Sequence, residues 1–350
     1  MSSGTAPGKA ILFGEHAAVY GHPAIAAALS LSLTVDMMAD PHASGLAPYG
    51  LGRGAFGAPV DPHASGLAPY GPAGPRLVFR DPRTGETATF DASTGATEQK
   101  ESVVLASAMA AAGLAPEGCR FTAVCSGDLP LGVGLGSSAA FSIALLRALG
   151  AWRGVPFTED ELLHHGLTLE NVFHGRASGV DHTVATLGGC VHFVKGRTPA
   201  HRRVAVGGIV PLVVACVPRI ATAGHMVAGV AERRAASPVE YDARFAEIAA
   251  LTAAGECALA TGDLATLGRL FDLNHGHLRA IGVSVPALDA LVERARAAGA
   301  LGAKLTGAGG GGSVLAVFPN RETTEIYAAR LRAEGIDAFA TTIAPPPSTP

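Results

Sequence analysis

A glycine-rich segment, Pro130–Ala139, has the residue types of a phosphate-binding loop. It reads Pro-Leu-Gly-Val-Gly-Leu-Gly-Ser-Ser-Ala, follows a strand-like run and leads into a helical pattern. Glycines let a backbone approach an anion closely, and a helix N-terminus adds partial positive charge. The hydroxyls of Ser137 and Ser138 are hard oxygen ligands of the kind that a phosphate-bound Mg²⁺ needs. The segment therefore predicts a nucleotide phosphate site, with a glycine-rich turn capped by serine as the alternative.

This segment fits neither of the two most familiar phosphate-binding patterns. The lysine that ends the Walker pattern Gly-x-x-x-x-Gly-Lys is missing. The acidic residue that a dinucleotide fingerprint places at a strand end about twenty residues on is missing as well. The sequence therefore indicates a nucleotide-binding class other than these two.

Three further segments contain polar residues that could act beside a phosphate. The first is Pro7–Gly21, with Lys9, Glu15 and His16. The second is Glu170–His182, where Asp181 follows a Ser-Gly-Val turn, and the third is the glycine-rich Lys304–Leu315. Each also has an ordinary interpretation: a solvated lysine near a terminus, an aspartate in a turn or cap, and a tight turn that packs two domains.

The periodicity of apolar residues predicts the elements that position these segments. Thr158 with Glu161 three residues later predicts the start of one helix. Strands interleave irregularly with helices, which favours an α+β architecture over a doubly wound sheet. The predicted helices are Ser102–Gly113, Ser137–Leu149, Glu159–Val172, Glu240–Leu259, Leu264–Ala280 and Val285–Ala298. The predicted strands include residues 10–13, Arg76–Arg80, Glu86–Phe90, Phe121–Ser126, Gly189–Val194 and Val210–Val217, with a buried apolar segment at Pro23–Val35.

Length and composition predict two domains. A chain of 350 residues with 48% hydrophobic residues exceeds what one core usually organises. We place the boundary at Pro218, giving domains over residues 1–217 and 218–344 and a disordered tail at 345–350. The string DPHASGLAPYG occurs at Asp40–Gly50 and again at Asp61–Gly71. Two copies rich in Pro and Gly cannot bury a shared face, so residues 40–75 are predicted to be a flexible insertion.

Charge and cysteine usage exclude several classes of function. The formal net charge of −3 is spread without long runs of one sign, so no nucleic-acid or membrane partner is expected. The sequence shows no signal-peptide pattern and no apolar stretch long enough to span a membrane, which indicates a cytoplasmic protein. The five cysteines form no Cys-x-x-Cys pair, so neither a disulfide framework nor a zinc site is expected.

Taken together, these segments resemble the signatures of the superfamily of galactokinase, homoserine, mevalonate and phosphomevalonate kinases, called the GHMP kinases. The string Pro-x-x-x-Gly-Leu-Gly-Ser-Ser-Ala is similar to the superfamily's phosphate loop, and the other segments follow in the expected order. Ala17-Ala-Val after Gly-Glu-His resembles the mevalonate kinase form, whereas galactokinases continue with Thr-Asp-Tyr. The resemblance implies a two-domain α+β fold, with a ribosomal-protein-like N-terminal domain and a ferredoxin-like C-terminal domain. It also implies phosphorylation of the C5 hydroxyl of mevalonate by ATP in isoprenoid biosynthesis.

The resemblance further implies roles for individual residues. Asp181 would be the general base, and Lys9 the cation that offsets developing charge. Ser138 and Glu170 would bind Mg²⁺. The residues expected to bind ATP are Pro130, Gly132, Gly134, Leu135, Gly136, Ser137, Ser138 and Ala139. Those expected to bind mevalonate are Lys9, Glu15, His16, Asp181, Thr222, Gly307 and Ala308.

Two alternatives stay open on the sequence. One keeps the superfamily and changes the acceptor to phosphomevalonate, homoserine or a sugar, because the connection around Thr222 is longer than mevalonate kinases usually have. The other is a nucleotide-binding regulator without activity, against which the complete set of Lys9, Ser138, Glu170 and Asp181 argues. The expected partners are ATP and mevalonate, with a homodimer as an open possibility.

Overall fold

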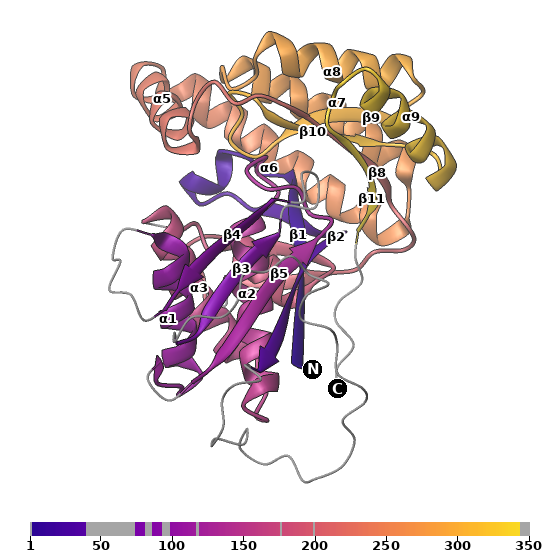
Figure 1. Ribbon diagram of the computed structural model, residues 1–350. Coiled ribbons are helices and arrows are strands. Elements are labelled where there is room, and N and C mark those ends of the chain that lie inside the picture. The colour runs from indigo at the N-terminus through magenta and orange to yellow at the C-terminus, as the bar shows by residue number, and fades with distance from the viewer. Residues whose placement is uncertain are drawn as a thin grey trace. The chain divides into compact units, whose positions relative to one another are not determined.

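The chain folds into two compact α+β units, as a computed structural model shows (Figure 1). The structure describes residues 2–39, 74–80, 86–92, 99–116, 119–175, 177–198 and 200–343. The duplicated string and the C-terminal tail lie outside these residues. The α+β class expected from the sequence is confirmed, since strands and helices are interspersed irregularly and most of the strand pairs are antiparallel.

Unit 1 comprises Met1–Ala6, Leu33–Gly127 and Phe141–Arg176. Its strands are the end of β2 (Ala24–Ala39), the hairpin β3 (Arg76–Arg80) and β4 (Thr87–Asp91), and β5 (Phe121–Gly127). Its helices are α1 (Lys100–Ala111), most of α2 (Ser137–Trp152) and α3 (Glu159–His174). β2 runs antiparallel to β5, with Val35 opposite Cys125. Phe141 of α2 packs against Phe79 and Phe173, with ring centroids 4.6 and 6.4 Å apart, so aromatic contacts fill this core.

Unit 2 comprises Pro7–Ser32, Asp128–Ala140 and Ala177–Pro350. It contains most of β1 (Ser2–Phe13), the short 3₁₀ helix η1 (Ala17–Tyr20) and the start of β2, which pairs with β6 (Cys190–Phe193). β6 pairs in turn with β7 (His201–Val204), and α4 (Val180–Leu187) precedes both.

The C-terminal part of unit 2 is a four-stranded antiparallel sheet with helices packed against it. The strand order is β11-β8-β10-β9, and every neighbouring pair is antiparallel. Phe245, Leu278, Leu291, Leu305 and Phe318 belong to one buried core between sheet and helices. The strands are β8 (Pro211–Val217), β9 (Gly302–Thr306), β10 (Gly312–Val317) and β11 (Ala338–Thr342). The helices are α5 (Ala223–Ala236), α6 (Pro238–Thr261), α7 (Leu264–Ala280), α8 (Pro286–Ala297) and α9 (Arg321–Ala333).

Local sequence signals explain where most helices begin. Thr158 and Glu161 form the capping box that the sequence predicts at the start of α3. Asp263 and Asn320 accept hydrogen bonds from the amides of Thr266 and Thr323, each three residues later. α8 has a proline at its first helical position, as expected. The starts of these helices therefore coincide with local capping signals.

The structure refines two predicted segments. Pro23–Val35 was expected to be a buried segment of undefined type, and most of it forms β2, a strand of 16 residues. Asp181 follows a bend at Gly179, as expected, and lies in the first turn of α4, whose N-cap is Gly179 with φ 92°. The expected domain boundary at Pro218 stays a prediction.

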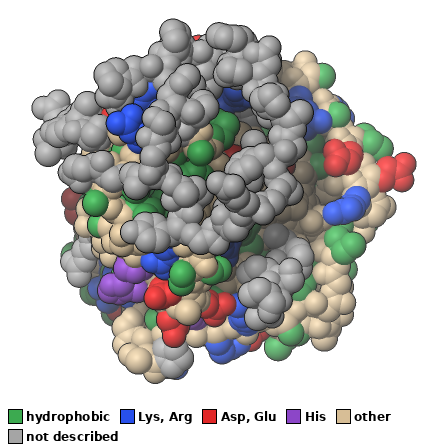
Figure 2. Space-filling model, turned by 60° about the horizontal axis from the view of Figure 1, so that its bottom comes forward, with side chains coloured by type: hydrophobic (Ala, Val, Ile, Leu, Met, Phe, Trp, Pro, Cys, Tyr) green, Lys and Arg blue, Asp and Glu red, His purple; other side chains and the backbone are tan. Residues whose placement is uncertain are grey.

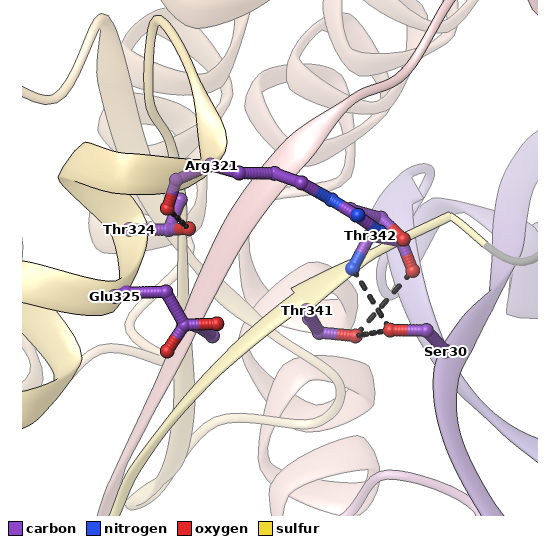
Figure 3. Close-up of a pocket in the computed structure, with 7 residues that line it drawn as sticks. Ser30, Arg321, Thr324, Glu325, Thr341 and Thr342 are labelled. Carbon is purple, nitrogen blue, oxygen red and sulfur yellow. Dashed lines mark hydrogen bonds between the residues drawn. The ribbon is translucent and has the colours of Figure 1, made fainter.

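A polar pocket of about 210 Å³ lies in unit 2 between β11 and the start of α9 (Figure 3). The hydroxyls of Ser30 and Thr341 are 3.0 Å apart, and the amide of Thr342 donates to Ser30 Oγ at 3.2 Å. The pocket contains none of the residues to which the sequence analysis assigns chemistry. On the face shown in Figure 2, basic and acidic side chains are intermixed. In the part of the chain that the structure describes, no helix is long and apolar enough to cross a membrane.

Candidate active site

The glycine-rich loop has a backbone that only glycine tolerates at alternate positions. Gly132, Gly134 and Gly136 have φ of 76°, 92° and 71°, in the left-handed region. A Cβ at Gly134 would collide with the guanidinium of Arg219, and one at Gly136 would lie 2.9 Å from Lys9 Cγ. The loop ends where α2 begins at Ser137, so the first amides of that helix continue the row of loop amides. This arrangement is a backbone cradle for an anion.

Lys9 contacts the cradle and Asp181 at the same time. Its backbone amide donates to the carbonyl of Leu135 at 2.8 Å. Its ammonium lies 3.2 Å from Asp181 Oδ1, and the two side chains are 7% and 27% exposed. A carboxylate with this partial exposure is accessible to a small molecule while the buried lysine fixes its orientation. The structure thus brings together a backbone cradle, a cation and a carboxylate from three separate segments of the sequence.

His16 follows Glu15 in the first of these segments and has an unusual backbone conformation. Its φ is 62°, and among the described residues it is the sole non-glycine residue with positive φ. Its Nε2 lies 2.9 Å from the carbonyl oxygen of Ala308. Because that oxygen can only accept, Nε2 carries the hydrogen, and Nδ1 is the acceptor of the neutral ring. Burial lowers the pKa of His16, partly offset by the hydrogen bond to Ala308, so the neutral ring is favoured near neutral pH.

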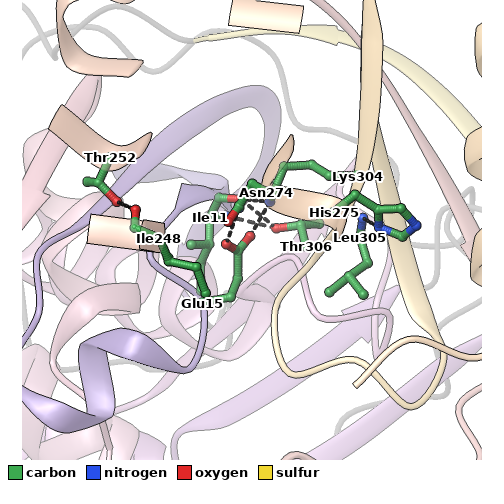
Figure 4. Close-up of polar contacts among 9 residues, drawn as sticks. All are labelled: Ile11, Glu15, Ile248, Thr252, Asn274, His275, Lys304, Leu305 and Thr306. Carbon is green, nitrogen blue, oxygen red and sulfur yellow. Dashed lines mark hydrogen bonds and ion pairs between the residues drawn. The ribbon is translucent and has the colours of Figure 1, made fainter. Parts of the chain in front are cut away.

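Glu15 is held inside a buried polar cluster (Figure 4). Its Oε1 forms an ion pair with Lys304, and its Oε2 accepts from Asn274 Nδ2 at 3.1 Å. Lys304 also donates to the carbonyl of Ile11 at 3.2 Å, and both side chains of the ion pair have no exposed surface. Burial lowers the pKa of Lys304, and Glu15 opposes that shift. Both carboxylate oxygens of Glu15 therefore have protein partners.

The segment after β8 supplies residues that the sequence analysis assigned only in part. Thr222 is the N-cap of α5 and accepts from the amide of His225 at 3.2 Å. Arg219, which the sequence analysis did not assign, is exposed and lies against Gly134 and Gly312. The amide of Ile220 donates to the carbonyl of Gly310 at 2.9 Å and holds this segment against the C-terminal glycine-rich loop. Arg219 could not be identified from the sequence, because no local pattern around it indicates that it lies against Gly134 and Gly312.

The residues expected to bind a metal lie in different units. Glu170 is buried near the end of α3 in unit 1, with His174 Nε2 3.8 Å from its Oε2. Ser137 and Ser138 open α2 within unit 2. Among the residues that the structure describes, no three His, Cys, Asp or Glu side chains gather as a metal-binding group. Each of these residues offers hydroxyl or carboxylate oxygen, the ligand type that Mg²⁺ takes in small number while it stays bound to phosphate.

Comparison with protein families identifies two matching segments. Residues 102–189 match the family described as GHMP kinases N terminal domain. Residues 256–337 match GHMP kinases C terminal. The first segment contains the phosphate cradle, Glu170 and Asp181, and the second contains Lys304 and the C-terminal glycine-rich loop.

Curated relatives match over nearly the whole chain. A mevalonate kinase of Thermococcus sibiricus is 33% identical over 332 residues, covering 91% of this chain and 90% of the relative. A mevalonate kinase of Methanothermobacter thermautotrophicus is 32% identical over 322 residues, with 91% and 90% covered.

Solved structures share the fold. L. major mevalonate kinase in complex with R-mevalonate superposes with a TM-score of 0.79 at 24% identity, covering 99% of this chain and 96% of that one. Methanococcus jannaschii mevalonate kinase superposes with a TM-score of 0.76 at 22% identity, and the match covers 98% of each chain. Lactococcus lactis galactokinase complexed with galactose superposes with a TM-score of 0.67 at 19% identity, and the match covers 99% of this chain and 94% of that one.

Proposed function

Because the chain belongs to the mevalonate kinase family of the GHMP kinases, we propose that it transfers the γ-phosphoryl group of ATP to the C5 hydroxyl of mevalonate. The observation that carries this proposal is the double contact of Lys9. Its amide is bound to the phosphate cradle at Leu135, and its ammonium is paired with Asp181. A phosphate site and a proton acceptor are thereby joined through one residue.

In the proposed reaction, Asp181 accepts the proton of the C5 hydroxyl as that oxygen attacks the γ-phosphorus. The bond between the γ-phosphorus and the bridging oxygen breaks, and ADP leaves with the electron pair. The ammonium of Lys9, 3.2 Å from Asp181 Oδ1, offsets negative charge around the reacting oxygens. Phosphoryl transfer has a loose transition state, so positioning and charge compensation supply most of the acceleration, and the base adds about 10²–10⁴-fold.

The phosphates would bind at Gly132–Ser138, where the cradle amides and the N-terminus of α2 supply positive charge. Arg219 lies against Gly134 and would supply a second cation to the phosphates, in addition to Lys9. Ser138 at the start of α2 would bind the Mg²⁺ that arrives with ATP, with Ser137 as a weaker candidate, and the role implied for Glu170 stays a prediction. When bound, the metal neutralises charge on the phosphate oxygens.

Mevalonate would lie between Lys9, His16 and Asp181, close to Thr222, Gly307 and Ala308. Because Nε2 of the neutral His16 ring donates to the carbonyl of Ala308, Nδ1 can accept a hydrogen bond from a hydroxyl group of mevalonate. Glu15 was expected to touch mevalonate directly. Because Lys304 and Asn274 occupy its carboxylate, we propose that it acts by holding the neighbouring His16 in place.

A coupled assay of ADP release over a panel of acceptors tests this function. We expect mevalonate to give the highest kcat/KM when compared with phosphomevalonate, homoserine and galactose, and the product to carry one added phosphoryl group. A higher kcat/KM for another acceptor would refute the choice of mevalonate within the family. ATP binding without turnover on any acceptor would instead favour a regulator.

A further inference from the structure

The phosphate cradle needs partners for its outward-facing carbonyl groups. When alternate residues turn their amides into one concavity, the carbonyls between them point away from it and must be satisfied by other segments. Leu135 meets this need through the backbone amide of Lys9, at 2.8 Å. The carbonyl of Val133, between Gly132 and Gly134, is satisfied from a different part of the chain.

That partner is Ser313, at the start of β10. Its Oγ donates to the carbonyl of Val133 at 2.9 Å, across a separation of 180 residues. Ser313 is 2% exposed and is paired in the sheet with Thr306 of β9 and Cys216 of β8. Its backbone is therefore fixed from both sides. Such a hydroxyl can orient the loop without reorganising itself.

The hydrogen bond of Ser313 has a defined direction. A hydroxyl has one hydrogen, and a carbonyl oxygen can only accept, so the hydrogen points to Val133. Cys216 Sγ, 3.5 Å from Ser313 Oγ, is then placed to donate its weak S–H to the remaining lone pairs of the hydroxyl. The Ser313 hydroxyl therefore donates its one hydrogen to the carbonyl of Val133, so that it cannot donate to a nucleotide as well.

The same C-terminal loop also orients the other side of the site. Ala308 accepts from His16 at one end of the loop, and Ser313 holds Val133 at the other. Between them, Gly310 accepts from the amide of Ile220, which places Arg219 beside Gly134. The loop therefore connects the proposed acceptor site to the proposed phosphate site through three hydrogen bonds.

We propose that Ser313 is a positioning residue for nucleotide binding, which holds the carbonyl of Val133 outward so that the amide of Gly134 faces the phosphates. This inference rests on the proposed use of the cradle for ATP. It does not depend on which acceptor is phosphorylated. Without the hydroxyl, the Val133 carbonyl is free to turn, and the cradle must be ordered by the ligand.

Replacing Ser313 by alanine tests the proposal with a minimal change in volume. We expect the Kd for ADP, measured by calorimetry, and the KM for ATP to rise about fivefold, the effect of one typical hydrogen bond. The KM for mevalonate should stay within about twofold, because the contacts of His16 and Asp181 are untouched. Ser313→Thr keeps the hydroxyl and should return ADP affinity towards that of the unaltered protein.

Thr324→Val is the matched control, because Thr324 is also 2% exposed and donates one hydrogen bond, to the carbonyl of Arg321 at 2.6 Å. It should lower the melting temperature as much as Ser313→Ala does and leave ADP affinity unchanged. The proposal is overturned if Ser313→Ala binds ADP normally, if the control weakens ADP binding equally, or if a folded Ser313→Thr binds as weakly as the alanine variant. ADP binding is measured without an acceptor. If the protein binds ADP but does not phosphorylate mevalonate, the proposed acceptor is refuted and the Ser313 test stays valid.

Discussion

At the scale of single residues, Lys9 joins two parts of the site. Its backbone holds the cradle at Leu135 while its side chain holds Asp181. A displacement of β1 would therefore move the phosphate site and the proton acceptor together. Replacing the Lys9 side chain removes one of these contacts and leaves the other, because the amide is present in every residue except proline.

Asp181→Asn separates catalysis from nucleotide binding. Asparagine keeps the size and most hydrogen bonding but cannot accept the proton, so we expect kcat to fall by about 10² or more with little change in ATP affinity. Steady-state kinetics together with calorimetry of ATP binding measure both effects. Asp242→Asn, which alters an exposed carboxylate paired with Arg234, should leave kcat unchanged.

Near-normal turnover in Asp181→Asn would show that the residue is only a helix-terminal aspartate, and the mechanism would fail. A fall in ATP affinity as large as the fall in kcat would instead assign Asp181 to the metal site.

Lys304→Met should strongly destabilise the protein. It leaves the carboxylate of Glu15 buried without its cation, which costs about 3–5 kcal/mol when one partner of a buried pair is removed. The double variant Glu15→Gln/Lys304→Met removes both charges and should recover much of that loss. Urea denaturation measures both, with Lys195→Met as an exposed control. A loss below about 1 kcal/mol for Lys304→Met would contradict the importance of this pair.

At the scale of elements, apolar periodicity predicted most helices, whereas α5 was not predicted although Thr222 caps it. α7 begins and ends where the sequence predicts, at Leu264 and Ala280, and Asp263 is its N-cap. β2 is continuously buried only from Ala24 to Leu29, where an apolar run does not distinguish a strand from a buried helix. From Ser30 to Met38 buried and more exposed residues alternate, which is a strand signal that the sequence prediction did not use.

The site was predictable where the chemistry lies within a motif. The sequence places Lys9, His16 and Asp181 in motifs, and the structure brings Lys9 together with Asp181. Ser313 and Arg219 could not be found in this way, because their partners Val133 and Gly134 are far away in the sequence. Contacts of this kind are fixed by tertiary packing and leave no local signal.

Gly134→Ala tests the conformation of the cradle. Alanine is strained at φ 92°, and its Cβ would displace the exposed guanidinium of Arg219 from beside the loop, so we expect the KM for ATP to rise about tenfold or more. Gly113→Ala is the control for backbone strain alone, because Gly113 has φ 69° and open space around it. That variant should lose about 1 kcal/mol of stability and keep its KM for ATP. Equal values of KM in both variants would contradict a close fit at Gly134.

At the scale of the whole molecule, buried histidines should make folding sensitive to acid. Burial lowers the pKa of His16 and His275, and lowers that of His182 from 6.5 to about 4. Below about pH 6.5 these histidines bind protons in the unfolded chain but stay neutral in the folded chain. Stability should therefore fall as pH falls, by up to about 1.4 kcal/mol per pH unit for each histidine.

Urea denaturation between pH 7.5 and 5.5 measures this dependence. His182→Gln removes one of the histidines whose pKa is lowered by burial and should give a shallower slope than the unaltered protein. The range stops above the pH at which carboxylates begin to contribute. A stability that is flat over this range would show that the three rings accept protons in the folded state.

The complete burial of Lys304 has a further, practical consequence. Its ammonium has no exposed surface, whereas Lys195 lies in an exposed turn. An amine-reactive reagent therefore modifies Lys195 in the native protein but reaches Lys304 only when the region around β9 opens. The extent of acylation at Lys304 relative to Lys195, read by mass spectrometry of peptides, reports how often this part of the molecule opens.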